Sequence, residues 1–399
     1  MNTGLSDNSA AHHRDLCEIL RRQSRLDEAL DHGLRALALA PDDAEAHYNL
    51  GLVHADRLEI AQAIAAERRA VALEPDHASA HFELAELLLV NGQFDEGWRE
   101  YEWRFRLPDV PPPLPPAFAD TPVWDGRAMP EGRLLLVADQ GFGDTIQFAR
   151  YIPMVAERCP NLFVAGSAEV EPIVRQQPGI AGYFNHWERV PACDAYCTLS
   201  GLPRHFATQL GNIPAAIPYV RAEPGRVRHW RQRLDSLIPT GYRRIGLVWA
   251  GRATHGNDAN RSTSLRTLAP LMALDGVAFV ALRMEAALAQ IGGYFGRAPL
   301  INLGAEIADF NDTMAIIDGL DMVVTVDTSV AHLAGAMGKP VSVLLPYAPD
   351  WRWMLDRGDS PWYPTMTLFR QQAPGHWPSA LEELVRTLTS TSSMMTPHR

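Results

Sequence analysis

Side chains that could bind an anion occur close together in the stretch 322–346. Asp327, Thr328 and Ser329 directly follow a short β-branched apolar run, and His332 comes three residues later. The run is typical of a buried parallel strand and all three polar residues are good N-caps, so we expect a strand that leads into a helix. A helix N-terminus offers unpaired N–H groups and positive dipole charge, which suits an anion such as a diphosphate.

The position of His332 on this predicted helix has two interpretations. It lies four residues after Thr328, so both side chains are expected on the helix face toward the anion. The same pattern also fits an ordinary βαβ unit with a capped helix and a packed histidine, because such units are common in proteins of many functions.

A second stretch offers a carboxylate for acid–base chemistry. The apolar run 133–138 predicts a buried strand, and Gly141 and Gly143 behind it allow a tight turn into a helix. Asp144 is expected where that helix begins, exposed on the turn, where its carboxylate can accept a proton from a substrate hydroxyl. The alternative is a purely structural role as the N-cap of the helix.

A third stretch, the polar loop 250–262, contains two arginines. They are Arg252 and Arg261, and the loop also holds Gly251, His255, Asn257 and Asn260. The whole chain has 36 basic and 47 acidic residues and a net charge of −11. In such a chain, two arginines at strand ends are candidates for neutralising a phosphate, although many surface arginines are only solvated.

These stretches belong to a region, from Glu131 onward, in which short apolar strands alternate with helices. Strands are expected at 133–138, 244–249, 277–282, 300–303, 322–326 and 341–345, and helices at 226–237, 309–319 and 379–388. Further short elements are expected at 162–165, 173–176 and 195–199. Two such blocks predict two Rossmann-like domains that face each other across a cleft. Ligands of these domains bind at the carboxyl ends of the strands, where the polar stretches lie.

The first hundred residues repeat with a period of 34. Pro41 and Pro75 are 34 residues apart (75 − 41), and so are Leu50 and Leu84. This period resembles the tetratricopeptide repeat, and three units fit, at about 10–43, 44–77 and 78–107. Stacked helix pairs of this kind present a concave surface to peptides or partner proteins. The histidines at 47, 54, 77 and 81 lack the ligand partners of a closed zinc site, so no metal is predicted there.

Composition limits the class of protein. The chain has 399 residues, of which 47% are hydrophobic and 21% charged, which is typical of a globular protein of two or three domains. It shows neither an apolar run as long as a membrane span nor a signal-peptide stretch, so a cytoplasmic protein without a transmembrane segment is expected. The net negative charge argues against general binding of nucleic acids or anionic membranes. The cysteines at 17, 159, 193 and 197 are expected to be reduced.

Two of the polar stretches resemble a known family. GFGDTIQFARYIP, residues 141–153, resembles the Gly-x-Gly-Asp block that opens the heptosyltransferase-type glycosyltransferases of family nine. VDTSVAHLAGAMGKPV, residues 326–341, resembles that family's Asp-Thr-Gly-x-x-His donor motif. The resemblance covers about 131–378, and the preceding repeats are similar to those of bacterial proteins that join tetratricopeptide repeats to such a domain. It implies a GT-B fold, metal-independent inverting transfer, no cofactor, and a nucleotide-diphosphate sugar as co-substrate.

The resemblance also implies roles for single residues. Asp144 matches the family's proposed catalytic base, which deprotonates the acceptor hydroxyl. Asp327, Thr328 and His332 match contacts to the donor diphosphate and sugar, and Arg261 stands near the family's basic residue facing the diphosphate, where lysine is usual. Ser329 replaces the glycine that lets the backbone approach the phosphate. The donor side further includes Gly251 and Arg252, and the acceptor-side loop includes Gln140, Gly141 and Gly143.

The expected fold class is therefore α + α/β, a helical repeat solenoid followed by a GT-B glycosyltransferase. The expected parts are repeats at 1–107, a proline-rich linker at 108–130, an acceptor domain at 131–238, a donor domain at 239–388 and a disordered tail at 389–399. The expected partners are a nucleotide sugar and a protein or polysaccharide acceptor recruited by the repeats. Two alternatives stay open: a non-catalytic repeat scaffold or sugar-nucleotide sensor, and another GT-B enzyme such as a sugar-nucleotide epimerase.

Overall fold

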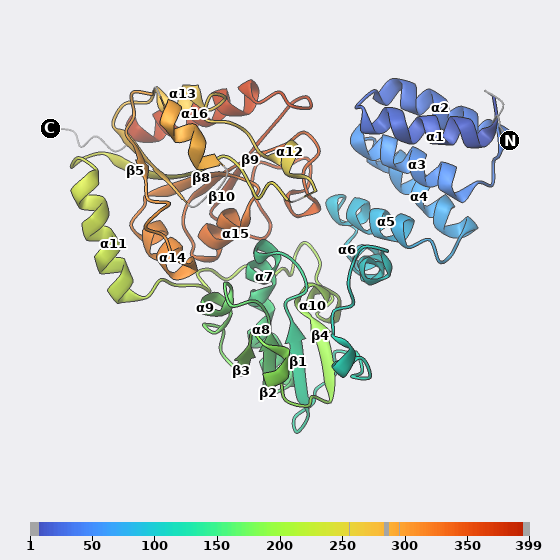
Figure 1. Ribbon diagram of the computed structural model, residues 1–399, viewed down its shortest axis with the longest axis horizontal. Helices are drawn as coiled ribbons and strands as arrows, with labels where there is room; N and C mark the ends of the chain where they lie inside the picture. Colours follow the sequence, from blue (N-terminus) through green and yellow to red (C-terminus); the bar gives the residue numbers. More distant parts are fainter. Residues whose placement is uncertain (1–7, 255, 283–286, 295, 394–399) are drawn as a thin grey trace. The chain divides into compact units, whose positions relative to one another are not determined.

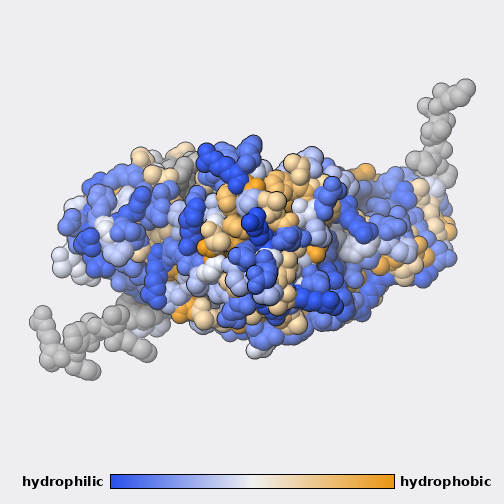
Figure 2. All heavy atoms as spheres, turned by 90° about the horizontal axis from the view of Figure 1, so that it is seen from below, coloured by the Kyte–Doolittle hydropathy of each residue, from blue (hydrophilic) through white to orange (hydrophobic). Residues whose placement is uncertain are grey.

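The chain divides into two compact units (Figure 1). The computed structural model describes residues 8–254, 256–282, 287–294 and 296–393. The first unit comprises the residues up to Pro113 together with the segments 207–212 and 350–355, and the second comprises the remainder. Hydrophilic side chains cover most of the face shown in Figure 2, with apolar side chains in smaller areas between them. No helix within the described ranges is long and apolar enough to cross a membrane.

In its described residues the first unit contains six α-helices in three consecutive pairs, which confirms the predicted repeats. The helices are α1 (Ala10–Arg22), α2 (Leu26–Leu39), α3 (Ala44–Asp56), α4 (Ile60–Leu73), α5 (Ala78–Val90) and α6 (Phe94–Tyr101). Within the second helix of a pair, Ala29 and Ala63 are fully buried at equivalent positions, and so are Ala36 and Ala70. These small side chains let neighbouring helices approach closely, which gives the 34-residue period its physical basis.

The turn inside each pair uses the same backbone conformation. Ser24 and Leu58 have a φ of 58° and Gly92 has a φ of 78°, all in the left-handed region and spaced 34 residues apart. Only the third turn uses glycine, the residue that adopts this conformation without steric cost.

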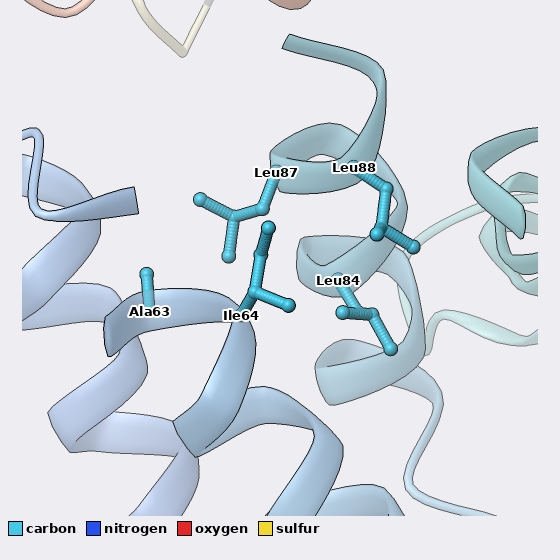
Figure 3. Close-up of a cluster of buried hydrophobic side chains, with 5 residues drawn as sticks. All are labelled: Ala63, Ile64, Leu84, Leu87 and Leu88. Carbon is cyan, nitrogen blue, oxygen red and sulfur yellow. The ribbon is translucent and has the colours of Figure 1, made fainter. Parts of the chain in front are cut away.

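An apolar cluster joins the second and third pairs (Figure 3). Ala63 and Ile64 of α4 pack with Leu84, Leu87 and Leu88 of α5, and all five are at most 5% exposed. Burying one leucine or isoleucine side chain contributes about 1.5–3 kcal/mol, so this cluster is a main source of cohesion between neighbouring repeats.

Two segments distant in sequence complete the first unit. The indole Nε1 of Trp98 donates a hydrogen bond to the carbonyl of Thr208 at 3.0 Å. The ring of Trp98 also meets that of Trp351 edge to face, with ring centres 5.3 Å apart. Trp351, from the aromatic-rich stretch after Pro346, therefore lies in a buried aromatic cluster of this unit.

The second unit contains two parallel sheets, as predicted. The first has the strand order β3-β2-β1-β4 and the second the order β10-β9-β8-β5-β6-β7. The strands are β1 (Arg133–Val137), β2 (Asn161–Ala165), β3 (Ile180–Phe184), β4 (Ala195–Thr198), β5 (Arg243–Val248), β6 (Val277–Ala281), β7 (Leu300–Asn302), β8 (Met322–Val326), β9 (Val341–Leu345) and β10 (Met366–Arg370). The central strands are buried along almost their whole length because helices cover the sheets. Two parallel α/β sheets following helical repeats are the fold class expected from the sequence.

Helices connect the strands of both sheets. They are α7 (Phe142–Phe148), α8 (Ile152–Arg158), α9 (Glu171–Val174), α10 (Leu202–His205), α11 (Pro224–Leu237), α12 (Asp258–Arg261), α13 (Ala269–Met272), α14 (Phe310–Asp318), α15 (Ser329–Ala336) and α16 (Pro378–Ser393). The element expected at 173–176 is the short helix α9, which begins two residues earlier, at Glu171. The last helix extends beyond its expected end at 388, so the predicted disordered tail is wrong for 389–393, and 394–399 lie outside the described residues.

The predicted proline-rich linker, 108–130, is partly packed rather than a free spacer. Leu114 is 7% exposed and joins an apolar cluster with Leu135 and Val137 of β1. Trp124 is 2% exposed, and its backbone N–H donates to the carbonyl of Tyr196 at 2.7 Å. The later part of this segment therefore belongs to the core of the second unit. All four cysteines are free thiols.

Candidate active site

Both sheets reverse their strand order at a point flanked by the polar loops. In the first sheet β1 and β4 are neighbours, and in the second β5 and β8 are neighbours, although the chain leaves each pair in opposite directions. Ligands of doubly wound sheets bind beside such switch points, at the carboxyl ends of the strands. Gln140 and Gly141 follow β1, the loop with Gly251 follows β5, and Asp327 follows β8.

The N-cap residue of α15 does not cap the helix with its side chain. Thr328 is its N-cap but makes no side-chain capping hydrogen bond, and its hydroxyl lies 3.2 Å from that of Thr325. Asp327 and Ser329 on either side are half-buried. The cap side chain therefore does not occupy the first N–H groups of the helix. Gly338, with a φ of 72°, follows the end of the helix.

The loop after β5 holds Arg261 close to the backbone of Gly251. A β-carbon on Gly251 would lie 2.8 Å from Arg261 Nη2 and 2.5 Å from Asp258 Oδ1, so a larger residue here would displace one of these side chains. Arg261 is 15% exposed in its side chain, and its Nε lies 3.5 Å from Asp258 Oδ1. That Nε is buried and has no hydrogen-bond partner among the described residues. Asp258, which the sequence analysis did not select, thus orients Arg261, the predicted phosphate-binding residue. His255 of the same loop lies outside the described residues.

Helix α7 of the first sheet packs against α15 of the second (Figure 1). A β-carbon on Gly143 would lie 2.8 Å from His332 Cδ2 and 3.3 Å from its Nε2. The close approach of the two helices at this point therefore depends on the glycine. Asp144 follows Gly143 in the first turn of α7, whose N-cap is Gly141. The alternative role of Asp144 as the N-cap is wrong, and its half-buried carboxylate lies one residue from the His332 contact.

The imidazole of His332 is held from its other side by a tyrosine. His332 is 5% exposed, and its Nδ1 lies 3.0 Å from the hydroxyl of Tyr363. Burial raises the pKa of Tyr363 well above its usual value, so the hydroxyl stays protonated. Tyr363 follows α15 by more than two dozen residues, and no short motif indicates it.

Arg252 takes a different position from Arg261. Its side chain is exposed, and its guanidinium carbon lies 5.3 Å from the ring centre of Phe142 on α7. Glu169 after β2 is also within its electrostatic reach. Hydrogen bonds from its own backbone N–H and from Ser167 lower the pKa of Glu169, and Arg252 lowers it further. The loop after β5 thus approaches the loops of the first sheet.

A cavity of about 290 Å³ opens at the carboxyl ends of β1, β2 and β3. It is lined by Val137, Ala138, Ala165, Gly166, Ser167, Phe184, Asn185, His186, Trp187 and Val190. Nearby, Asp139 Oδ1 after β1 accepts a hydrogen bond from Ser200 N after β4 at 3.2 Å. The sequence analysis predicted neither the cavity nor the Asp139–Ser200 hydrogen bond. The polar and aromatic residues that follow β3 could have indicated the cavity. Within the described ranges no group of three or more His, Cys, Asp or Glu side chains could hold a metal ion.

Gly143→Ala tests the contact between α7 and α15. We expect this change to destabilise the second unit by about 1–3 kcal/mol, because the new methyl group overpacks against the buried His332 ring. Calorimetric melting measures the effect. Gly358→Ala is the matched control, since no atom lies within 4 Å of its would-be β-carbon. Equal melting of the two variants would show that the helices separate easily.

Comparison with known proteins adds three kinds of finding. Residues 18–56 match a model described as TPR repeat, 48–101 match Tetratricopeptide repeat, and 298–354 match Glycosyltransferase family 9 (heptosyltransferase). The chain is 26% identical to Protein FlbA of Caulobacter vibrioides over 382 residues, which cover 86% of this chain and 61% of FlbA. The chain thus spans less than two thirds of that relative.

Two solved structures are similar to the α/β part. One is the E. coli ADP-heptose lps heptosyltransferase II, at 14% identity and a TM-score of 0.47, covering 66% of this chain and 99% of that one. The other is the family 9 glycosyl transferase of Veillonella parvula, at 10% identity and a TM-score of 0.47, covering 68% of this chain and 100% of that one. The family matches thus place tetratricopeptide-repeat similarity within residues 18–101 and similarity to glycosyltransferase family 9 within residues 298–354.

Proposed function

We propose that this protein is a glycosyltransferase that moves a sugar from a nucleotide-diphosphate sugar to an acceptor hydroxyl. The observation that carries the proposal is the family 9 match at 298–354, because this segment contains β8, the N-terminus of α15 and His332. The switch point between β5 and β8 supports it, since the candidate donor-binding groups lie at the ends of these two neighbouring strands.

On this proposal the donor diphosphate binds between α15 and Arg261. The first N–H groups of α15 and the guanidinium of Arg261 donate hydrogen bonds to phosphate oxygens, and Gly251 leaves room for the arginine. Charge grows on the diphosphate as its bond to the sugar breaks, and these fixed donors stabilise it. Ser329 adds a hydroxyl at the start of the helix. A metal ion is not part of this proposal, and undiminished transfer in the presence of EDTA is the expected result.

The acceptor approaches from the side of α7. Asp144 takes the proton of the acceptor hydroxyl while that oxygen forms a bond to the anomeric carbon of the sugar. The bond between the anomeric carbon and the diphosphate breaks at the same time, so the nucleoside diphosphate leaves and the anomeric configuration inverts. The cavity beyond β1, β2 and β3 is a candidate for holding the acceptor, which we propose is a protein or a polysaccharide.

Arg261→Ala tests the donor site. We expect the dissociation constant of the nucleotide sugar to rise about 10- to 100-fold, because a hydrogen bond to a charged group is worth about 1.5–3 kcal/mol. Isothermal titration calorimetry measures the change. Arg266→Ala, which removes the same charge from an exposed position five residues later, is the control. An unchanged dissociation constant for Arg261→Ala would remove this residue from the donor site.

The experiment that tests the function is a thermal-shift screen of the full chain with ADP-, GDP-, UDP- and dTDP-sugars. A donor at a hundred times its dissociation constant adds about 2.7 kcal/mol of stability, which raises the melting temperature measurably. A shift with one nucleotide class, followed by release of its nucleoside diphosphate with an acceptor extract, is the expected result. Binding without release would favour a sugar-nucleotide sensor, and no shift with any donor would contradict the proposal.

A further inference from the structure

The repeat unit contains a buried carboxylate without a partner. Glu67 on α4 is 0% exposed, and neither Oε1 nor Oε2 has a hydrogen-bond partner among the described residues. Its carboxyl group lies directly against α3, because a β-carbon on Gly51 would come within 2.1 Å of Oε1. A buried polar group without a hydrogen-bond partner destabilises the folded state by about 1–3 kcal/mol. Glu67 is therefore a marked departure from the apolar packing around it.

Further carboxylates surround the end of this side chain. Glu45 on α3 and Glu83 on α5 both act electrostatically on Glu67, and all three act on Tyr48 of α3. The side chain of Glu45 is 48% exposed, and Glu83 and Tyr48 are half-buried. We call Glu45, Glu67 and Glu83 the carboxylate cluster. It runs from the surface of the first helices of two neighbouring repeats down to the buried Glu67.

The basic side chains near the cluster are Arg21, which acts on Glu83, and Arg14 and His77, which act on Glu45. The nearby arginine, Arg21 of α1, already pairs with Asp56, with 2.9 Å between Nη1 and Oδ2. Glu45 shares a hydrogen bond with His77 at 3.1 Å, while no hydrogen bond or ion pair reaches the Glu83 side chain in the described part of the chain. The carboxylates do not form a metal-ligand set among the residues that the structure describes. Glu67 is thus a buried carboxylate with unused acceptors, and the nearby Arg21 is held by Asp56.

We propose that the carboxylate cluster binds a lysine- or arginine-bearing segment of a partner protein. The ammonium or guanidinium group offers three or five N–H donors, which would supply the hydrogen bonds that Glu67 and Glu83 lack. The half-buried ring of Tyr48 adds an aromatic face that attracts a cation. An acidic or neutral segment would leave these acceptors unused and is disfavoured by charge. This assignment of the partner's chemistry holds whether or not the α/β unit transfers a sugar.

Binding of a cation should release protons from the cluster. Burial raises the pKa of Glu67 to about 10, with further contributions from Glu83 and Glu45. Burial also raises the pKa of Glu83 to about 7, opposed by Arg21 and increased by Asp56. Near neutral pH these groups therefore hold protons, which a bound cation displaces into solvent. Affinity for a basic segment should increase as the pH rises through 7.

The test is calorimetric titration of the full chain, without any nucleotide sugar, with an acetylated and amidated peptide of alternating lysine and alanine. At pH 8 and moderate salt we expect Glu67→Gln and Glu83→Gln each to weaken binding at least about 10-fold, as expected for a lost charge-assisted hydrogen bond. Titration in two buffers of different ionisation enthalpy should show proton release, and binding should be tighter at pH 8 than at pH 6. In Glu83→Gln, both the proton release and the difference in affinity between pH 8 and pH 6 should be smaller.

Glu28→Gln is the matched control, because Glu28 is an exposed carboxylate on α2 of the same unit. The proposal would be overturned if all three variants bound the peptide equally well. It would also be overturned if a peptide with glutamate in place of lysine bound as tightly, or if the lysine peptide did not bind at low salt. Helical circular dichroism checks that each variant is folded, and Glu83→Gln, at a half-buried position, carries the test if Glu67→Gln does not fold. If the chain did not bind any nucleotide sugar, the result of this peptide titration would be unaffected.

Discussion

Asp144→Asn is expected to reduce sugar transfer by about 10²- to 10⁴-fold while the donor dissociation constant stays within about threefold. The amide has nearly the same shape as the carboxylate but cannot take the proton of the acceptor hydroxyl. Asp144 lies in the first turn of α7, beside the Gly143–His332 contact, rather than on the loop that holds Arg261. Its removal should therefore affect the chemical step and spare binding of the diphosphate. Initial rates with saturating donor, together with donor titration, measure the two quantities.

The control for this experiment is Asp120→Asn, an exposed carboxylate of the same unit. It should leave both quantities unchanged. If Asp144→Asn weakened donor binding as much as turnover, Asp144 would belong to the donor site or to the folding of the loop. Full turnover by the variant would exclude it as the base.

Glu67→Gln is expected to remove most of a pH dependence of stability in the repeat unit. Burial raises the pKa of Glu67 from 4.5 to about 10. Between these values the folded chain holds one proton more than the unfolded chain, so stability is fully present below pH 4.5 and is lost as the pH rises toward 10. Glutamine stays neutral throughout. At pH 9 we expect the variant to melt at least about 4 °C above the natural chain, the shift that about 1 kcal/mol produces in a domain of this size.

Melting of the first unit at several pH values, followed by helical circular dichroism, checks this prediction. At pH 5 the two chains should differ little, because Glu67 is then neutral in the folded state. Glu28→Gln, which changes an exposed carboxylate, should not alter the pH dependence. A natural chain whose melting temperature does not fall between pH 5 and pH 9 would show that Glu67 is ionised and paired in the folded protein.

The sequence predicted the repeat helices and most strands because their signals are local or periodic, but it did not predict β3 and β10. Ala29 and Ala63 recur at 34 residues because each repeat buries a small side chain at the same place. The continuous apolar run of β8 and the N-cap residue Thr328 are likewise visible within a few positions of the chain. Boundaries were less accurate where tertiary packing extends an element, as in α16, which runs to Ser393.

The candidate donor loops were predicted because residues after neighbouring parallel strands must meet at one edge of the sheet. Sequence could not show what each side chain touches there. Asp258 pairs with Arg261, and Tyr363 bonds His332, through contacts that depend on how distant loops fold. The N-cap of α7 is Gly141, not Asp144, since the turn ends three residues before the carboxylate.

By itself the sequence determined the helical repeats, the two parallel α/β sheets and the loops in which candidate ligand-binding residues lie. Periodic burial and turn chemistry are written into neighbouring residues, so they need no knowledge of distant contacts. Only the tertiary structure decided that Gly143 lies against His332 and that Glu67 is buried among other carboxylates without a partner. A glutamate in a helix has the same local pattern whether its carboxyl group meets water or a neighbouring helix, and burial alone gives it a different pKa and a different role.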